Sequence, residues 1–144
     1  MKPHWWVTKD GDKDCLELHA RHYSRYEYAD GRERKLFVGP GDKLVLRTEQ
    51  GNACFVWRRF IDDSGQFGVN CALFRNEGAH LSSALVRQAD AIADAVWTDC
   101  RHYTYVDCSK VASANPGFCF IVAGWRRCGR TASGKLVLER VRQA

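Results

Sequence analysis

Three adjacent residues, His22, Tyr23 and Ser24, carry side chains that can move protons. A histidine with an ordinary pKa of about 6.5 suits general-base work near neutrality, and the serine hydroxyl can serve as its partner. Tyr23 falls on the apolar face of a helical segment, where a core position is more common than a catalytic one. The three residues could also simply cap and end that helix, so a catalytic and a structural interpretation both stay open.

A second pattern is a loop that joins an apolar strand, Phe67–Phe74, to a long helical segment. Its sequence is Arg-Asn-Glu-Gly-Ala-His over residues 75–80. The first amides of a helix have no partner within it, and its dipole is positive at that end, so the loop suits an anion such as a phosphate. The alternative is an ordinary strand-to-helix connection with a glycine at its turn. The candidate ligand-binding residues are Arg75, Asn76, Gly78, Ala79, His80, Ser82 and Ser83.

Two polar residues later in the chain complete the set of candidates. Asp107 ends a strand expected at His102–Asp107, and functional side chains gather at the carboxyl ends of central strands. Its alternative role is that of a turn or cap residue. Asn115 precedes Pro116, which suits the first position of a helix, so Asn115 would cap that helix and could also contact a cofactor.

Hydrophobic periodicity predicts three helices that would position these residues. The first spans about Asp14–Tyr26, with Asp14 as its N-cap. The second runs from Leu81 to Val96 on apolar residues at helical spacing, with Ser82 or Ser83 as its N-cap. The third is a short helix at Asn115–Ala123 that Gly124 ends.

Short extended runs between turn signals predict the strands. Ala53–Ile61 and Phe67–Phe74 flank a turn at residues 62–66 and are expected to form an antiparallel hairpin. Tyr103 and Tyr105 alternate with Thr104 and therefore share one strand face, either lining a cleft or packing in the core. The other expected strands are His4–Thr8, Lys35–Val38, Lys43–Arg47, His102–Asp107 and Leu136–Arg140. Hairpins mixed with helical crossovers predict an α/β (α+β) fold with a mixed, mostly antiparallel sheet and helices on both faces.

The composition of the 144 residues is that of a single folded domain spanning 1–144. No apolar run approaches the roughly 20 residues that span a bilayer, so we expect no membrane partner. Seven cysteines without Cys-x-x-Cys spacing predict reduced, buried thiols in a cytoplasmic protein and no metal site. The net charge of +5 leans toward an anionic cofactor or nucleic acid.

The order of elements, with the phosphate-type loop after the fourth strand, resembles the GNAT acyltransferase superfamily. The loop of that family has the form Gln/Arg-x-x-Gly-x-Gly/Ala, which Arg75 and Gly78 match, while His80 replaces the last small residue. The segment from Asn115 to Trp125 resembles the fourth helix of the family and the turn after it. Phe118 and Phe120 occupy the positions where many members carry a tyrosine acid.

This resemblance implies acetyl-CoA or another acyl-CoA as donor, with its pyrophosphate held by the amides of Gly78–Ser83. An amide of the strand Phe67–Phe74 would stabilise the oxyanion, and Asn115 would contact the cofactor. His22 or Asp107 would remove the proton of the acceptor amine, directly or through water.

The His-Tyr-Ser segment at residues 22–24 resembles that of phage Mom-type proteins, which are GNAT-like enzymes that modify adenine in DNA. That similarity implies a phage-type protein with DNA as its acceptor and chemistry at His22, Tyr23 and Ser24. Two alternatives remain: an N-acetyltransferase for a small-molecule or protein amine, and a non-catalytic nucleic-acid- or protein-binding module. Tryptophans beside arginines could stack on bases, although core packing is the commoner outcome at this spacing.

Overall fold

A computed structural model describes residues 4–20, 36, 38–39, 41–60, 65–108 and 117–141. These residues form three helices and seven strands. The helices are α1 (Lys13–Ala20), α2 (Ser82–Val96) and α3 (Phe118–Val122). The strands are β1 (Trp5–Thr8), β2 (Asp42–Thr48), β3 (Ala53–Arg59), β4 (Val69–Asn76), β5 (His102–Val106), β6 (Trp125–Arg130) and β7 (Leu136–Arg140).

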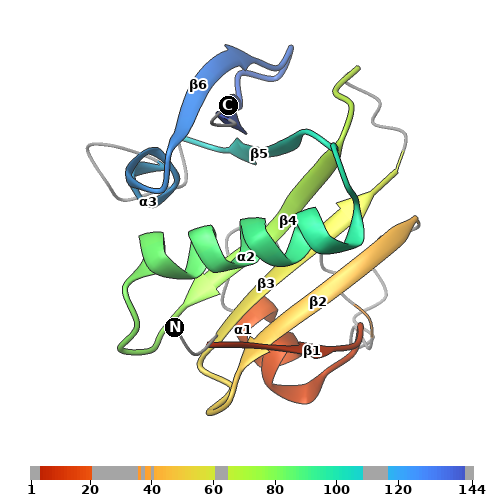
Figure 1. Ribbon diagram of the computed structural model, residues 1–144, viewed down its shortest axis with the longest axis vertical. Helices are drawn as coiled ribbons and strands as arrows, with labels where there is room; N and C mark the ends of the chain where they lie inside the picture. Colours follow the sequence, from red (N-terminus) through yellow and green to blue (C-terminus); the bar gives the residue numbers. More distant parts are fainter. Residues whose placement is uncertain are drawn as a thin grey trace.

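The seven strands form one sheet in the order β1-β2-β3-β4-β5-β7-β6 (Figure 1). Strands β4 and β5 run parallel, joined by the α2 crossover, and every other neighbouring pair is antiparallel. The sheet is therefore mixed and mostly antiparallel, which confirms the predicted fold class. Three hairpins, β2–β3, β3–β4 and β6–β7, and one long crossover explain this mixture.

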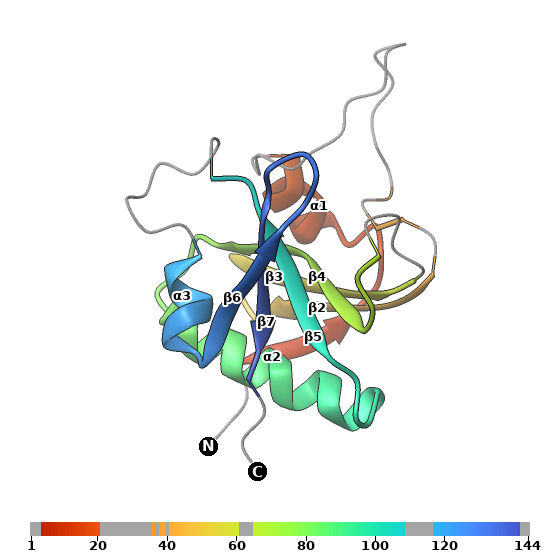
Figure 2. The same ribbon diagram turned by 90° about the horizontal axis from the view of Figure 1, so that it is seen from above.

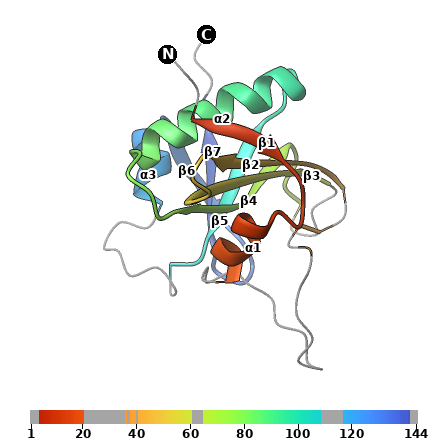
Figure 3. The same cartoon turned by 90° about the horizontal axis from the view of Figure 1, so that it is seen from below.

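Helices cover both faces of the sheet, as predicted (Figure 3). On one face α2 contributes Leu85, Val86, Ala89 and Ala93 to a core that also contains Phe55 and Trp57, among others. On the other face α1 packs Cys15 and Leu18 against buried residues of β2, β3 and β4. Each fully buried Leu or Val side chain contributes about 1.5–3 kcal/mol, so these two layers hold the sheet between them.

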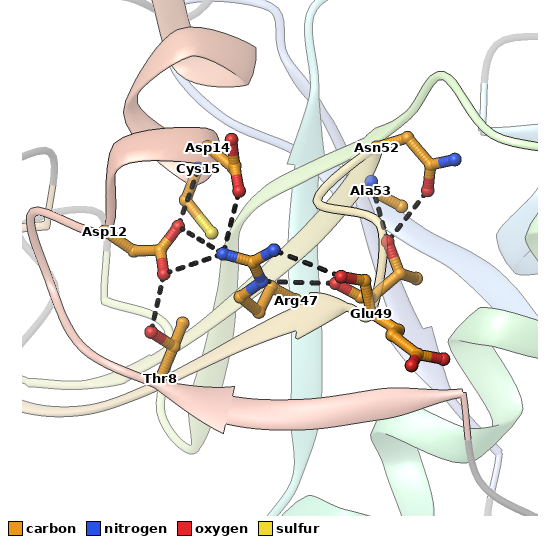
Figure 4. Close-up of polar contacts among 9 residues, drawn as sticks. Thr8, Asp12, Asp14, Cys15, Arg47, Glu49, Asn52 and Ala53 are labelled. Carbon is orange, nitrogen blue, oxygen red and sulfur yellow. Dashed lines mark hydrogen bonds and ion pairs between the residues drawn. The ribbon is translucent and has the colours of Figure 1, made fainter.

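Helix α1 begins earlier than the sequence predicts, because Asp12 and not Asp14 is its cap. Asp12 Oδ1 accepts a hydrogen bond of 3.0 Å from the amide of Cys15, and Asp12 Oδ2 accepts one of 2.7 Å from the hydroxyl of Thr8. The guanidinium of Arg47 on β2 pairs with Asp12 at 3.3 Å and with Asp14 at 2.8 Å (Figure 4). Asp14 is thus engaged with β2. The residues after Ala20, including the predicted end of this helix at Tyr26, lie outside the described residues.

The predicted N-cap of α2 is also wrong. Leu81 occupies the cap position and makes no side-chain cap bond, whereas Ser82 and Ser83 are already helical. The hydroxyl of Ser82 instead accepts a hydrogen bond of 2.9 Å from the Asn76 side chain, and Ser83 is buried. A serine that has a better partner in the preceding loop does not need to cap the helix.

The C-terminal part differs most from the prediction. Helix α3 begins at Phe118 after Gly117, which has a left-handed backbone, and ends with Ala123 at its C-cap before Gly124. Asn115 and Pro116 lie outside the described residues. Strand β6 was not predicted at all, although it pairs with β7 along its whole length and has a bulge between Arg127 and Gly129.

Tryptophans and cysteines have mostly structural roles in this fold. Trp5, Trp57 and Trp125 are buried core residues, which supports packing over base stacking, while Trp6 is 54% exposed. All seven cysteines are free, as predicted. Cys15, Cys54 and Cys71 are buried, as expected. Cys100, Cys108 and Cys119 are only half-buried and Cys128 is exposed on β6, so these four depart from the expectation of buried thiols.

Candidate functional site

A cleft opens between β4 and β5 because the two strands pair over only part of their length. Three residues of β4, Val69, Asn70 and Cys71, pair with His102, Tyr103 and Thr104 of β5. Beyond this point β4 and β5 diverge, and β5, β7 and β6 run across the direction of β2–β4 (Figure 2). The cavity between them measures about 170 Å³. It is lined by residues 70–74 of β4, residues 104–107 at the end of β5, Phe120 and Lys135.

A β-bulge in β4 lies inside this cleft. Val56 of β3 pairs with Leu73, whereas the next residue, Trp57, pairs with Cys71. Ala72 is therefore an extra residue with no pairing partner on β3, and it also lies beyond the last residue of β4 that pairs with β5. A bulge bends its strand and re-aims the local backbone groups, so the amides near Ala72 are turned away from the regular ladder. The bulge lies within Phe67–Phe74, the strand whose amide is predicted to bind the oxyanion.

The point of divergence is held by a hydrogen bond from a side chain. The hydroxyl of Thr104 on β5 donates to the carbonyl oxygen of Cys71 on β4 at 2.9 Å, and Thr104 is buried. Burial raises the pKa of Cys71 well above its ordinary value. Cys71 is therefore a neutral thiol near pH 7 and lines the cleft as a small apolar residue, without the thiolate that a nucleophile needs.

Of the predicted catalytic residues, Asp107 lies in the cleft. It follows the last residue of β5 and lines the cavity together with Tyr105 and Lys135. Tyr105 and Tyr103 lie on one face of β5 with their rings 5.7 Å apart, as the alternation predicts. His22, Tyr23 and Ser24 lie outside the described residues, as does Asn115.

The loop between β4 and α2 has the predicted position, at the carboxyl end of β4. Asn76 organises it: its side-chain nitrogen donates to the carbonyl oxygen of His80 at 2.8 Å and to the Ser82 hydroxyl at 2.9 Å. Its side-chain oxygen accepts a bond of 3.0 Å from the amide of Gly78. The helix ladder starts only at Leu85, whose amide bonds to Leu81, so the amides of residues 82–84 precede the first helical bond.

Four contacts of this loop depart from the resemblance to a phosphate loop. The amide of Gly78 bonds within the loop, and a Cβ atom at Gly78 would meet the side chain of Asn52 at 2.6 Å. The ring of His80 stacks on that of His4, with centroids 3.8 Å apart. Arg75 pairs with Glu77 at 3.0 Å. The amides that remain for an anion therefore belong to Ala79 and to the first turn of α2.

Comparison with protein-family models finds no match, and neither the comparison with curated proteins nor that with solved structures finds one. The site must be judged on its own geometry. Within the part of the chain that the structure describes, no helix has the length and apolarity to cross a membrane. Among the same residues no group of three or more His, Cys, Asp or Glu side chains is arranged to hold a metal ion.

Three residues at the cleft were not singled out from the sequence. Asn70 stands alone among apolar neighbours in Val69–Phe74, and a single polar residue in such a run is a signal that could have identified it. Ala72 gives no signal, because a bulge here is marked by neither glycine nor proline. Lys135 reaches the cleft only through the β6–β7 hairpin, which the sequence analysis did not predict.

Proposed function

We propose that this protein is an acyl-CoA-dependent N-acyltransferase of the GNAT type, of phage or prophage origin, that modifies a base in DNA, with adenine as the acceptor. The observation that carries the proposal is the cleft between the parallel strands β4 and β5, which begins beside a bulge and leads toward the loop at the amino end of α2. A narrow opening within a sheet suits an extended donor chain. A helix terminus at its far end suits the phosphates of that donor.

On the donor side, the fit depends on backbone amides. The first turn of α2 has no acidic residue and no side-chain cap, so its positive end is not neutralised by the helix itself. Ala79 is exposed, and Asn76 fixes the loop conformation from within. We assign the pyrophosphate to the amides from Ala79 to Ser83, one residue beyond the Gly78 amide.

On the reaction side, acyl-CoA supplies the acyl group as a thioester. The amine nitrogen of the acceptor forms the new C–N bond as the C–S bond breaks, and the sulfur leaves with the bonding electron pair. A backbone amide of the Ala72 bulge would donate to the carbonyl oxygen as negative charge develops on it. The proton lost by the amine passes to Asp107 in the cleft or to His22, directly or through water.

On the acceptor side, the β6–β7 hairpin supplies positive charge. Between Trp125 and Arg140 the only acidic residue is Glu139. The basic residues of the same segment are Arg126, Arg127, Arg130, Lys135 and Arg140. Arg130 and Lys135 are exposed, and Lys135 lines the cleft itself. Positive side chains around a reaction site attract and orient a phosphate backbone, which supports DNA over a cationic amine as acceptor.

A charge placed at Ala79 tests the donor site. Ala79→Glu puts a carboxylate beside the amides assigned to the pyrophosphate, and Ala79→Gln is the neutral control of equal size. We expect Ala79→Glu to weaken acetyl-CoA binding at least tenfold in calorimetry while thermal stability is kept or raised, because an acidic group favours a helix amino end. Ala79→Gln should bind acetyl-CoA almost as the wild type does. Equal affinity in all three proteins would overturn the donor-site assignment.

Activity is measured on the same proteins with DNA and acetyl-CoA, by mass analysis of the released nucleosides. A heavier deoxyadenosine formed by the wild type and by Ala79→Gln, and lost in Ala79→Glu, is the expected result. Acetyl-CoA binding without any new nucleoside would reject DNA as acceptor and favour the N-acetyltransferase for a small-molecule or protein amine.

The second candidate function is a non-catalytic binding module. The internal bond of the Gly78 amide and the stacking of His80 on His4 favour it, since both occupy groups that a phosphate loop would present to a ligand. Absence of acetyl-CoA binding by the wild type, with DNA binding retained, would select this candidate.

A further inference from the structure

The side-chain oxygen of Asn70 is buried and has no hydrogen-bond partner within the described part of the chain. The residue is only 7% exposed, and its side-chain oxygen makes no hydrogen bond there. A buried polar group without a partner costs about 1–3 kcal/mol, and native proteins satisfy most such groups. Because Asn70 lines the cavity, this oxygen is available to accept a hydrogen bond from a molecule that enters it.

The position of Asn70 along β4 indicates which molecule this is. Asn70 pairs with Tyr103 of β5 and lies just before the strands part. At about 3.3 Å per residue, some 20 Å of strand separate it from Asn76, where the pyrophosphate loop begins. Asn70 is thus at the closed end of the cleft, two residues from the Ala72 bulge, where the reacting atoms would meet. The group that bonds to the Asn70 side chain would therefore belong to the acceptor molecule and not to the acyl donor.

The face of the sheet supports the same assignment. Val69 and Cys71 belong to the core beneath α2, so the intervening Asn70 lies on the opposite face of β4. Tyr103, its register partner, and Tyr105 lie on the corresponding face of β5. Asn70 and Tyr105 both line the cavity, with Asp107 at its edge. An acceptor bound in this cavity would lie next to the amide of Asn70, the ring of Tyr105 and the carboxylate of Asp107.

The chemistry of a carboxamide defines the edge that it recognises. Its oxygen accepts a hydrogen bond and its nitrogen donates one, side by side. The complement is an amino group next to a ring nitrogen, and the pairing of Asn with adenine N6 and N7 is the familiar example in DNA recognition. We infer that Asn70 binds the acceptor base by its exocyclic amine and the adjacent ring nitrogen, and selects adenine. This inference rests on the proposed function, whose donor site it does not involve.

The geometry of that pairing leaves the reaction possible. An exocyclic amine has two hydrogens, and one of them would form a hydrogen bond to the Asn70 oxygen. The other hydrogen remains for Asp107 at the edge of the cavity to remove. Asn70 would therefore be a positioning residue. Its loss should raise the KM for DNA and abolish the selection of the base, while the affinity for acetyl-CoA should change little.

The test uses Asn70→Leu and Asn70→Asp in the full chain, with single-stranded oligonucleotides that contain one adenine, one 7-deazaadenine or one cytosine. The deaza base keeps the amine and loses the ring acceptor N7. The wild type should prefer adenine to 7-deazaadenine by about tenfold, the discrimination that one bidentate pair gives. Both variants should lose that preference and bind acetyl-CoA as the wild type does.

Stability separates this role from a structural one. Asn70→Leu removes an unsatisfied polar group of similar size, so its free energy of unfolding should equal or exceed that of the wild type. If Asn70→Leu modifies adenine with wild-type KM and selectivity, the inference is wrong while the acyltransferase stands. A wild type that binds acetyl-CoA but modifies only cytosine, or no DNA base, also overturns it. Failure of acetyl-CoA binding itself would instead remove the proposed function.

Discussion

His102 Nδ1 lies 2.7 Å from Asp90 Oδ1, and both side chains are buried. The second oxygen of Asp90 accepts a hydrogen bond of 2.9 Å from the indole of Trp125. One carboxylate of α2 thereby holds the first residues of β5 and of β6. One turn further along α2, Asp94 forms two bonds of 2.7 Å with Arg140 of β7.

The bonds made by Asp90 and Asp94 connect the two halves of the sheet, which diverge between β4 and β5. Strands β4 and β5 pair over three residues only, so little backbone bonding joins the two halves. Helix α2 spans both: the indole of Trp57 on β3 donates to the carbonyl of Ala89 at 3.1 Å, and Asp90 binds the other half. Helix α2 thus connects the two halves of the sheet that lie on either side of the cleft.

Asp90→Asn should reveal how much this connection contributes. The substitution keeps one acceptor oxygen and removes the charge, so we expect a loss of about 2–3 kcal/mol in the free energy of unfolding, measured in urea. Asp42→Asn on the exposed start of β2 is the control and should change it by less than about 0.5 kcal/mol. Adding His102→Gln to Asp90→Asn should cost less than the sum of the single changes. Full additivity would mean that the two residues act independently.

The cap of α1 gives a second prediction. Asp12→Ala removes the acceptor for the Cys15 amide and one partner of Arg47, and should lower the free energy of unfolding by about 1–2 kcal/mol. Asp12→Asn keeps an oxygen for the cap and should lose less. Chemical denaturation of the two variants compares the cap with the charge. If both lose the same amount, the ion pair with Arg47 and not the cap carries the effect.

Glu139 predicts a pH dependence of stability. Hydrogen bonds from Arg101 and then Arg126 hold the pKa of this carboxyl below its ordinary value, against a smaller opposing effect of burial. A carboxyl whose pKa is lower in the folded state stabilises the protein above the ordinary pKa, and this stability is lost as the pH falls through the folded value. The free energy of unfolding of the wild type should therefore exceed that of Glu139→Gln by about 1–2 kcal/mol at pH 7, and this difference should shrink below about pH 4. Glu17→Gln, on the exposed side of α1, is the control, and a difference independent of pH would contradict the assignment.

The parts of this fold that sequence alone predicts are those with a strong period. Leu85, Ala89 and Ala93 repeat at helical spacing and are buried on one face of α2, as expected. Strands β2, β3, β4, β5 and β7 fall within about two residues of their predicted bounds, because alternation and glycine turns mark them. The caps of α1 and α2 were misassigned, because Asp14 and Ser82 have partners on β2 and in the loop that sequence spacing cannot reveal.

Tertiary pairing accounts for the rest. Strand β6 is an edge strand with exposed arginines and a bulge at Cys128, so neither alternation nor an apolar run marks it. The cleft arises from the divergence of β4 and β5 and from the bulge at Ala72, which depend on strands far apart in the sequence. The positions of Arg75–Ser83 in a loop and of Asp107 at a strand end could be predicted because loop sequences and strand ends carry local signals, whereas their roles stay predictions.

The seven cysteines should differ widely in reactivity. The hydrogen bond that Cys15 shares with Cys54, together with burial, raises the pKa of Cys15, and burial raises that of Cys71 and Cys119, so these thiols resist deprotonation. Cys128 is exposed on β6. With limiting iodoacetamide at pH 8, peptide mass analysis should show Cys128 alkylated first and Cys15 and Cys71 only after unfolding. Rapid labelling of Cys71 in the native protein would mean that the cleft opens further than this structure indicates.

The proposed DNA contact predicts a defined response to salt. Arg130 and Lys135 are exposed at the β6–β7 hairpin, and each phosphate contact adds about 0.7–0.9 to the slope of log affinity against log salt. Arg130→Gln and Lys135→Gln should each weaken DNA binding similarly for all sequences and lower that slope by about this amount. Lys13→Gln makes the same charge change on α1, outside the hairpin, and should leave the slope unchanged. Fluorescence anisotropy between 50 and 200 mM salt measures it. If Lys13→Gln has the same effect as the hairpin variants, the attraction comes from net charge alone, and the hairpin is not the surface that holds DNA.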